Sequence, residues 1–388
     1  MFFYNSLHYS NPMPEKASIY LHIPFCRSKC AYCDFPSFAG IEELMEPYTA
    51  ALAREIDAAA KLQAPTVYIG GGTPSYLPAP LMEALLKKVI GHFYLEEQVE
   101  FTIEANPGTA SESNFRLWRR NRVNRLSIGV QSFNGRLLKN IGRGHNAADA
   151  RNTIAAARAA GFDNLSIDLI YGLPGQTLSD LKEDMRTLLG LWPEHASVYQ
   201  LILEEGTPLE KMVDKGEVSL PDDDETFEMG EAATGALAEA GYGHYEISNY
   251  ALPGRECRHN TAYWLGKPFL GLGSGAHSFI NGRRLANPEN VQEYIQLMES
   301  KGSASTEIVT DEKARTIDYL LMRLRLINKE ISFKEVGDTL SVDFKGHFNI
   351  PLTKLQAGGY ITLTDSSFRL SNKGIRYLDN IILELSKV

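Results

Sequence analysis

The chain has little cysteine for its length, with four residues in 388. That number excludes the disulfide framework that holds many small secreted domains together. Basic residues are also in the minority, because Lys and Arg total 39 against 48 Asp and Glu, and the formal net charge is -9. We therefore expect no nucleic-acid partner. Apolar runs stay short of the roughly 18 residues that a membrane span needs, so we predict no span.

The amino terminus lacks the basic start and apolar core of a secretory signal, so residues 1–16 are expected to be a short extension. Three of the cysteines are clustered, at Cys26, Cys30 and Cys33, while Cys257 lies far away in the sequence. Clustered cysteines in a reducing compartment indicate a metal or redox centre. We therefore predict a cytoplasmic protein.

Short segments rich in Ile, Leu, Val, Tyr and Phe alternate with amphipathic stretches along the first 240 residues. Alternation of strand and helix predicts right-handed βαβ units and a parallel sheet whose strands are covered on both faces. Six such units favour an α/β fold of the partial (β/α)6 barrel type. The expected strands are Ser18–Ile23, Thr66–Ile69, Val99–Glu104, Arg125–Val130, Asn164–Ile170 and Ala196–Leu203, and the expected helices include 43–61, 80–93, 148–160 and 178–191.

Polar and glycine-rich residues follow the ends of five of these strands. In α/β barrels the chemistry lies at the carboxyl ends of the strands. Any single segment of this kind is also explained by turn residues and helix caps. Five in phase instead predict one site assembled from Cys26, Gly70–Pro74, Glu104, Gln131 and Asp168.

The pattern changes in the second half of the chain. We expect a barrel unit over 17–300, with its core to about 240, and a segment rich in Gly, Tyr, Trp and His over 241–280. A smaller, mainly helical domain is expected over 301–388, where helices precede the hairpin 360–370. That order resembles a winged helix. The acidic balance of the chain favours a packing or lid role for this domain over DNA binding.

Cys26, Cys30 and Cys33 form a Cys-x3-Cys-x2-Cys loop directly after the first strand. Three thiolates in such a loop can bind three irons of a [4Fe–4S] cluster and leave the fourth iron open to a substrate. The alternative is a zinc site with His22 or Asp34 as a further ligand, although structural zinc sites usually show two separated ligand pairs.

This loop, followed by the glycine-rich end of the second strand, resembles the radical S-adenosylmethionine (SAM) superfamily. The phrases 20–26, 70–74, 104–107, 129–133, 142–145 and 168–176 narrow the resemblance to the oxygen-independent coproporphyrinogen III oxidase group, which includes the heme chaperones of the HemW type. The resemblance implies a [4Fe–4S] cluster on the three cysteines and an exchangeable SAM. By matching motif positions, it implies SAM contacts for Tyr20, Tyr32, Gly71, Gly72, Thr73, Glu104, Gln131, Arg143 and Asp168.

Structural explanations remain open for some of these residues. An ion pair between Arg143 and Asp168, or a helix cap by Glu104, would also account for the charges. Their chemistry nevertheless suits SAM, since a carboxylate binds ribose hydroxyls and a guanidinium binds a carboxylate.

The segment Cys257 to Trp264 resembles the His-Asn-x-x-Tyr-Trp signature of the heme chaperones. That resemblance implies a heme contact for His259, Asn260, Tyr263 and Trp264, since an imidazole can bind iron and aromatic rings can contact a macrocycle. The alternative is a hydrogen-bonded histidine in a loop. Cys257 is either a thiolate ligand, a covalent attachment point or an inert buried residue.

Phe35 stands where the oxidases of this group carry a further cysteine. A phenyl ring cannot replace a thiolate, so the favoured function is a heme chaperone that passes heme to an acceptor protein. The alternatives are radical decarboxylation of coproporphyrinogen III and a radical enzyme that acts on heme itself.

Overall fold

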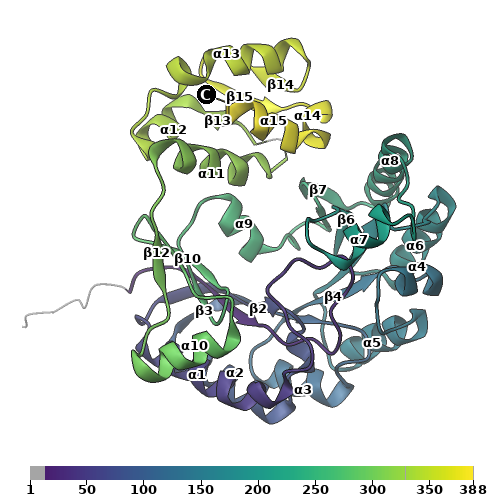
Figure 1. Ribbon diagram of the computed structural model, residues 1–388, viewed down its shortest axis with the longest axis vertical. Helices are drawn as coiled ribbons and strands as arrows, with labels where there is room; N and C mark the ends of the chain where they lie inside the picture. Colours follow the sequence, from purple (N-terminus) through teal and green to yellow (C-terminus); the bar gives the residue numbers. More distant parts are fainter. Residues whose placement is uncertain (1–13, 328, 388) are drawn as a thin grey trace, which may run out of the picture.

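The computed structural model describes residues 14–327 and 329–387. Its centre is a parallel sheet whose six strands follow one another in sequence, with helices between them (Figure 1). The strands are β1 (Ser18–Ile23), β2 (Gln63–Gly71), β3 (Tyr94–Ala105), β4 (Arg125–Gln131), β5 (Leu165–Tyr171) and β6 (His195–Gln200). The expected partial barrel is confirmed, although β6 ends three residues before Leu203.

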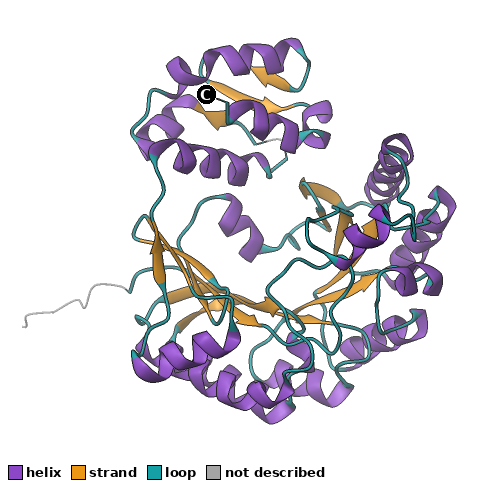
Figure 2. Ribbon diagram, viewed as in Figure 1, coloured by secondary structure: helices purple, strands orange, loops and turns teal. Residues whose placement is uncertain are grey.

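Helices cover the outer, convex face of this sheet (Figure 2). They are α1 (Met45–Ala58), α2 (Ala79–His92), α3 (Glu112–Arg120), α4 (Gly135–Asn140), α5 (Ala147–Ala159), α6 (Leu178–Leu191) and α8 (Asp223–Glu239), with short 3-10 turns at Glu42–Leu44 and Pro74–Tyr76. α7 (Pro208–Asp214) instead lies beside the cysteine loop, where the Leu209 amide donates to the Ala31 carbonyl at 2.8 Å. Side-chain caps define where several begin. Thr177 and Asp180, for example, form a capping box that fixes the start of α6 at the position the sequence predicts.

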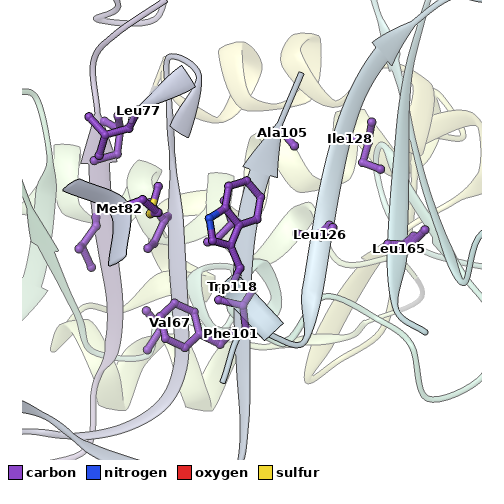
Figure 3. Packing of buried hydrophobic residues seen from close by; sticks show 14 of the residues in the cluster. Val67, Leu77, Met82, Phe101, Ala105, Trp118, Leu126, Ile128 and Leu165 are labelled. Atoms are coloured by element: carbon purple, nitrogen blue, oxygen red, sulfur yellow. The ribbon is translucent and has the colours of Figure 1, made fainter. Parts of the chain in front are cut away.

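The main core lies between the sheet and these helices. Trp118 of α3 is 1% exposed and packs among strand residues such as Phe101 and Leu126 (Figure 3). Burying aromatic and branched side chains of this size stabilises each by roughly 1.5–3 kcal/mol relative to exposure. The outer face of the barrel is therefore a continuous apolar layer that holds the strands in register.

The sequence predicts six strands in this sheet, but within the described residues the sheet has twelve strands. β9 (Phe269–Leu272) pairs in parallel with β1. β10 (His277–Ile280), β11 (Arg283–Ala286) and β12 (Thr306–Ile308) extend that edge, while β8 (Asn249–Ala251) and β7 (Gly243–Glu246) extend the other. α10 (Val291–Ser300) packs beside α1. Because β12 belongs to this sheet, the large unit continues past the boundary expected at residue 301 to Ile308.

The carboxy-terminal part has its own apolar core. It contains α11 (Glu312–Leu324), β13 (Ile331–Ser332), α12 (Phe333–Leu340), α13 (Phe344–Ala357), β14 (Ile361–Leu363), β15 (Ser367–Leu370), α14 (Asn372–Arg376) and α15 (Leu378–Leu385). The order of helices and the sheet β13-β15-β14 agree with the winged-helix-like expectation. Of the expected amino-terminal extension, residues 1–13 lie outside the described residues, and Glu15 accepts a hydrogen bond from the Gln63 amide.

α9 (Arg258–Trp264) lies on the concave side of the sheet, between the barrel and the carboxy-terminal domain (Figure 1). The guanidinium of Arg325, just after α11, lies 4.6 Å from the Trp264 ring of α9. The Ile247 amide donates to the Arg325 carbonyl, which joins the end of β7 to the same segment. The segment 241–280 is thus ordered structure and connects the two units.

Candidate functional site

Alternate residues of each strand point away from the helices and form the inner face of the barrel. This face is polar. Thr66 and Tyr68 of β2, Glu104 of β3 and Asp168 of β5 lie on this face. Hydrogen bonds connect Tyr68 with Glu104 and Asp168 with Ser127 of β4, while Thr66 contacts His259 of α9. The prediction from the sequence stressed the apolar residues of these strands and did not single out this polar face. The period-two alternation of polar residues is the sequence signal that would have shown it.

The cysteine loop follows β1 and is held by backbone hydrogen bonds. The Cys26 amide donates to the Phe38 carbonyl at 2.8 Å, and the Ala31 amide donates to the Ile141 carbonyl at 3.0 Å. All three predicted ligands are half-buried free thiols in this loop. Among the described residues, no three His, Cys, Asp or Glu side chains are grouped to hold a single metal ion. A [4Fe–4S] cluster differs in that each thiolate binds a separate iron.

The proposed zinc alternative has little support from its nearest candidate ligand. The Tyr20 hydroxyl lies 2.9 Å from His22 Nδ1, and His22 Nε2 lies 2.9 Å from the Pro36 carbonyl oxygen. Both ring nitrogens of His22 are therefore already hydrogen-bonded. Asp34 is exposed in the loop.

Gly71 and Gly72 bring the end of β2 close to the cysteine loop. Gly71 has a φ of +113°, and a Cβ there would lie 2.5 Å from the His22 ring. A Cβ at Gly72 would lie 2.9 Å from the Phe25 carbonyl oxygen. Only glycine allows this approach without a shift of the neighbours.

A hydrogen-bonded network spans two of the cysteines. Thr73 Oγ1 donates to Cys26 Sγ at 3.5 Å, and Asn106 Nδ2 donates to Thr73 Oγ1 at 2.8 Å. Arg143 Nη2 donates to Asn106 Oδ1 at 2.9 Å, and its Nη1 donates to Cys30 Sγ at 3.5 Å. Asn106 was not among the predicted site residues. Its place two residues after Glu104, in the same strand-end phrase, was the available signal.

Arg143 has no acidic partner in this network. Besides Asn106 and Cys30, it donates to the Gly129 carbonyl. Within the described part of the chain, its buried Nε has no hydrogen-bond partner. The alternative of an ion pair with Asp168 is wrong, because Asp168 instead accepts from Ser127 at 3.0 Å and Ser166 at 2.9 Å.

Glu104 is the second-last residue of β3, and its side chain reaches the glycine-rich end of β2. Its carboxylate accepts from the Tyr68 hydroxyl at 2.7 Å and from the Gly71 amide at 3.1 Å, so it caps no helix. Burial raises the pKa of Glu104 to about 7, and the charge of Asp168 adds to the shift. Burial also raises the pKa of Asp168. Two buried carboxyl groups that have no basic hydrogen-bond partner in the described part of the chain would favour a cationic or hydroxyl-bearing ligand.

The remaining predicted SAM residues lie around the same barrel end or on its wall. Gln131 has a left-handed φ of 67°, and its amide nitrogen would be 2.9 Å from a Cβ at Gly129. Tyr32 packs against an apolar cluster that includes Ile141 and Ile170. Tyr20 lies lower on β1, where its ring is 6.5 Å from that of His259. It is therefore the predicted SAM residue that also borders α9.

α9 carries the predicted heme residues. His259 is 1% exposed, and its Nδ1 lies 2.8 Å from Thr66 Oγ1 while its Nε2 lies 2.8 Å from the Tyr263 hydroxyl. Its ring stacks on Tyr68 at a centroid distance of 5.1 Å. Burial, with the nearby charge of Arg125, lowers the pKa of His259 to about 3. The imidazole is therefore neutral, but both nitrogens are engaged, as in the alternative of a hydrogen-bonded histidine.

The other residues of this motif differ in exposure and contacts. Asn260, Tyr263 and Trp264 are half-buried. Cys257 is fully buried, its thiol donates to Glu100 at 3.7 Å, and burial raises its pKa to about 12. A buried thiol that holds its proton does not suit a thiolate ligand or an attachment point.

A cavity of about 870 Å³ lies on the other side of α9. Thr66 and Ala262 are among its lining residues, and Lys16, Arg258 and Lys267 contribute positive charge. It lies near the amino ends of β1 and β2, whereas the cysteine loop follows the carboxyl end of β1. Thr66 separates it from His259 Nδ1.

Known proteins are similar to this chain both over the barrel alone and over most of its length. The sequence model described as Radical SAM superfamily matches residues 20–188. The heme chaperone HemW of Lactococcus lactis is 38% identical over 362 residues, which cover 92% of this chain and 95% of the relative. HemW of Escherichia coli is 35% identical, with 95% of this chain and 97% of the relative covered. The chain belongs to the HemW family of radical SAM proteins.

A solved structure titled coproporphyrinogen III oxidase (HemN) from Escherichia coli has the same fold. Its TM-score is 0.83 at 22% identity, with 96% of this chain and 90% of that chain covered. Membership of the radical SAM superfamily implies a [4Fe–4S] cluster and SAM. The residues of this HemW family member fit both groups, since three thiols share one loop and the Arg143 guanidinium beside them has no acidic partner among the described residues. No helix in residues 14–327 and 329–387 is long and apolar enough to cross a membrane.

Proposed function

We propose that this protein is a heme chaperone, which binds heme and transfers it to an acceptor protein. The observation that carries the proposal is its similarity, over 92% of its length, to a protein named heme chaperone HemW. The identity of the acceptor is left open by this similarity. A cytoplasmic location and the absence of a nucleic-acid partner remain predictions from the composition.

The [4Fe–4S] cluster would be held by Cys26, Cys30 and Cys33. When bound, it supplies the electron that cleaves SAM. The Arg143 guanidinium would bind the methionine carboxylate, for which its free Nε and its charge are suited. Glu104 would receive the methionine ammonium beside the Gly71 amide.

The rest of SAM would lie along the inner face. Asp168 and Gln131 offer a carboxylate and an amide to the ribose hydroxyls, and Tyr32 offers a ring to the adenine. Gly72 and Thr73 would meet the methionine end through their backbone, while Tyr20 lines the wall below.

Heme would bind beside α9, where His259, Asn260, Tyr263 and Trp264 are grouped. None of these four residues lines the cavity against this helix, whose walls are partly apolar, with Ala262 and Leu265 among them. Its Arg258 and Lys267 can attract the two carboxylates that heme carries. His259 can bind iron only after one of its two hydrogen bonds, to Thr66 or to Tyr263, opens. Binding by this histidine therefore requires a rearrangement of α9 or of Thr66.

The position of this cavity favours a carrier over a radical enzyme that acts on heme. A ligand there is at the opposite end of β1 from the cysteine loop, so the macrocycle would be cargo and not a substrate of the adenosyl radical. Phe35 is 62% exposed in the cysteine loop and offers no thiol, which weighs against coproporphyrinogen decarboxylation.

The test is an anaerobic hemin titration of cluster-reconstituted protein, followed by Soret absorbance. We expect saturation near one heme per chain, and an affinity at least tenfold weaker in His259→Ala. His92→Ala is the control, because His92 contacts the Ala59 carbonyl far from α9. Unsaturable binding by the wild type would refute the carrier proposal. Equal saturable binding by the wild type and His259→Ala would refute the His259 site.

A further inference from the structure

A chain of hydrogen bonds between buried and half-buried groups crosses the inner face of the barrel from the proposed SAM pocket to α9. Ser166 Oγ donates to Asp168 at 2.9 Å and lies 2.8 Å from His195 Nδ1. His195 Nε2 lies 2.8 Å from the Tyr245 hydroxyl, which accepts from the Cys257 amide at 3.1 Å. These consecutive contacts join the strands β5, β6 and β7 to the start of α9.

The donor and the acceptor of each hydrogen bond in this chain follow from the groups at its two ends. Ser166 has one hydroxyl hydrogen and gives it to Asp168, so its oxygen accepts from His195 Nδ1–H. His195 Nε2 then accepts the Tyr245 hydroxyl hydrogen. Burial lowers the pKa of His195 well below its usual value, which agrees with a neutral ring bearing one hydrogen. All donors therefore point toward the Asp168 carboxylate.

The far end of the chain anchors the start of α9. The helix has no side-chain cap of its own on Cys257. The Tyr245 oxygen holds the Cys257 amide, and the Glu100 carboxylate accepts the Arg258 amide at 3.0 Å and the His259 amide at 2.9 Å. The first turn of α9, which carries His259, is thus held by groups of the barrel.

We propose that His195 and Tyr245 are positioning residues that couple occupancy of the SAM pocket to the anchoring of α9. This inference rests on the proposed contact between Asp168 and the SAM ribose. A ribose hydroxyl that donates to Asp168 adds a donor to a carboxylate that already accepts from Ser127 and Ser166, and the shared negative charge weakens the bond from Ser166. Because each bond in a chain polarises the next, weakening of this first bond weakens the bonds that follow, down to the Cys257 amide. SAM therefore loosens the first turn of α9.

The test is hydrogen–deuterium exchange of the peptide that covers residues 257–260, in cluster-reconstituted protein with and without saturating SAM. One hydrogen bond is worth about a three- to tenfold change in exchange rate. We expect SAM to raise the rate by about that factor in the wild type. In Tyr245→Phe, exchange is already fast without SAM and does not respond to it.

The matched control is Tyr250→Phe. Tyr250 is buried on the adjacent strand β8, and its hydroxyl contacts Thr234 outside the chain. This variant should respond to SAM like the wild type. Ser166→Ala removes the first link with a minimal change in volume and should lose the response, even if Tyr245→Phe folds poorly.

No response to SAM in the wild type, or a full response in Ser166→Ala, would overturn the coupling. Failure of SAM to bind the wild type, measured by calorimetry, would overturn it as well. Heme is absent from this experiment. Failure of hemin binding in the titration would therefore refute the chaperone proposal. The hydrogen–deuterium exchange experiment tests the coupling separately.

Discussion

His259 and Tyr263 are one helical turn apart on α9, and the Tyr263 hydroxyl lies 2.8 Å from His259 Nε2. This bond occupies one of the two ring nitrogens that could bind iron, and Thr66 occupies the other. Burial also keeps the imidazole neutral. Binding to iron would therefore be limited by competition for the lone pair of the ring nitrogen and not by protonation. The contact therefore predicts a substitution that improves binding.

Tyr263→Phe should bind hemin about three- to tenfold more tightly than the wild type, since one hydrogen bond no longer competes with iron. The phenyl ring keeps the edge contact with His259, at a centroid distance of 4.8 Å. A Soret titration measures the change, with Tyr250→Phe as the control. Weaker binding in Tyr263→Phe would show that the hydroxyl serves heme directly.

Cys30→Ala should lack the broad iron–sulfur absorbance in the visible range after anaerobic reconstitution. Two remaining thiolates cannot hold a [4Fe–4S] cluster whose fourth iron has no protein ligand. Cys257→Ala is the matched control, because its buried thiol with a pKa of about 12 lies apart from the loop. Iron and sulfide analysis of both variants measures the content. A full cluster in Cys30→Ala would remove this cysteine from the site.

Arg143→Gln should weaken SAM binding by roughly ten- to a hundredfold, the range expected for a lost charged hydrogen bond. The glutamine retains a donor near Asn106 and Cys30 but has no charge for the methionine carboxylate. Calorimetry on reconstituted protein gives the affinity. Arg136→Gln, which removes an exposed pair with Asp180, should bind SAM like the wild type.

The affinity for SAM should rise as the pH increases from 6 to 8. Glu104 has a pKa of about 7, so its carboxylate becomes charged in this interval and can pair with the methionine ammonium. Glu104→Gln should bind weakly with little dependence on pH. A wild-type profile that is flat between pH 6 and 8 would contradict this role.

The same group affects folding in the opposite direction. The folded protein keeps the Glu104 proton up to about pH 7, whereas the unfolded chain releases it near the ordinary glutamate pKa of 4.5. Between these values the folded state binds more protons, so its contribution to stability decreases as the pH rises. Denaturant titrations of ligand-free protein should show this decrease in the wild type and a smaller one in Glu104→Gln.

The sequence by itself determined the six parallel strands, the helices between them and the grouping of polar residues after the strands. These features depend on local patterns. Capping residues such as Thr177 and Asp180 mark helix starts, and the spacing of Cys26, Cys30 and Cys33 lies within one loop. The winged-helix-like order of the tail was visible for the same reason.

Only the tertiary structure decided the contacts that join distant segments. β9 to β12 have three or four residues each, too few for a clear period, and β9 is held by pairing with β1. The Asn106 network and the bond of His259 to Thr66 depend on the register between strands. Register and burial arise from packing across the whole barrel, which local sequence does not encode.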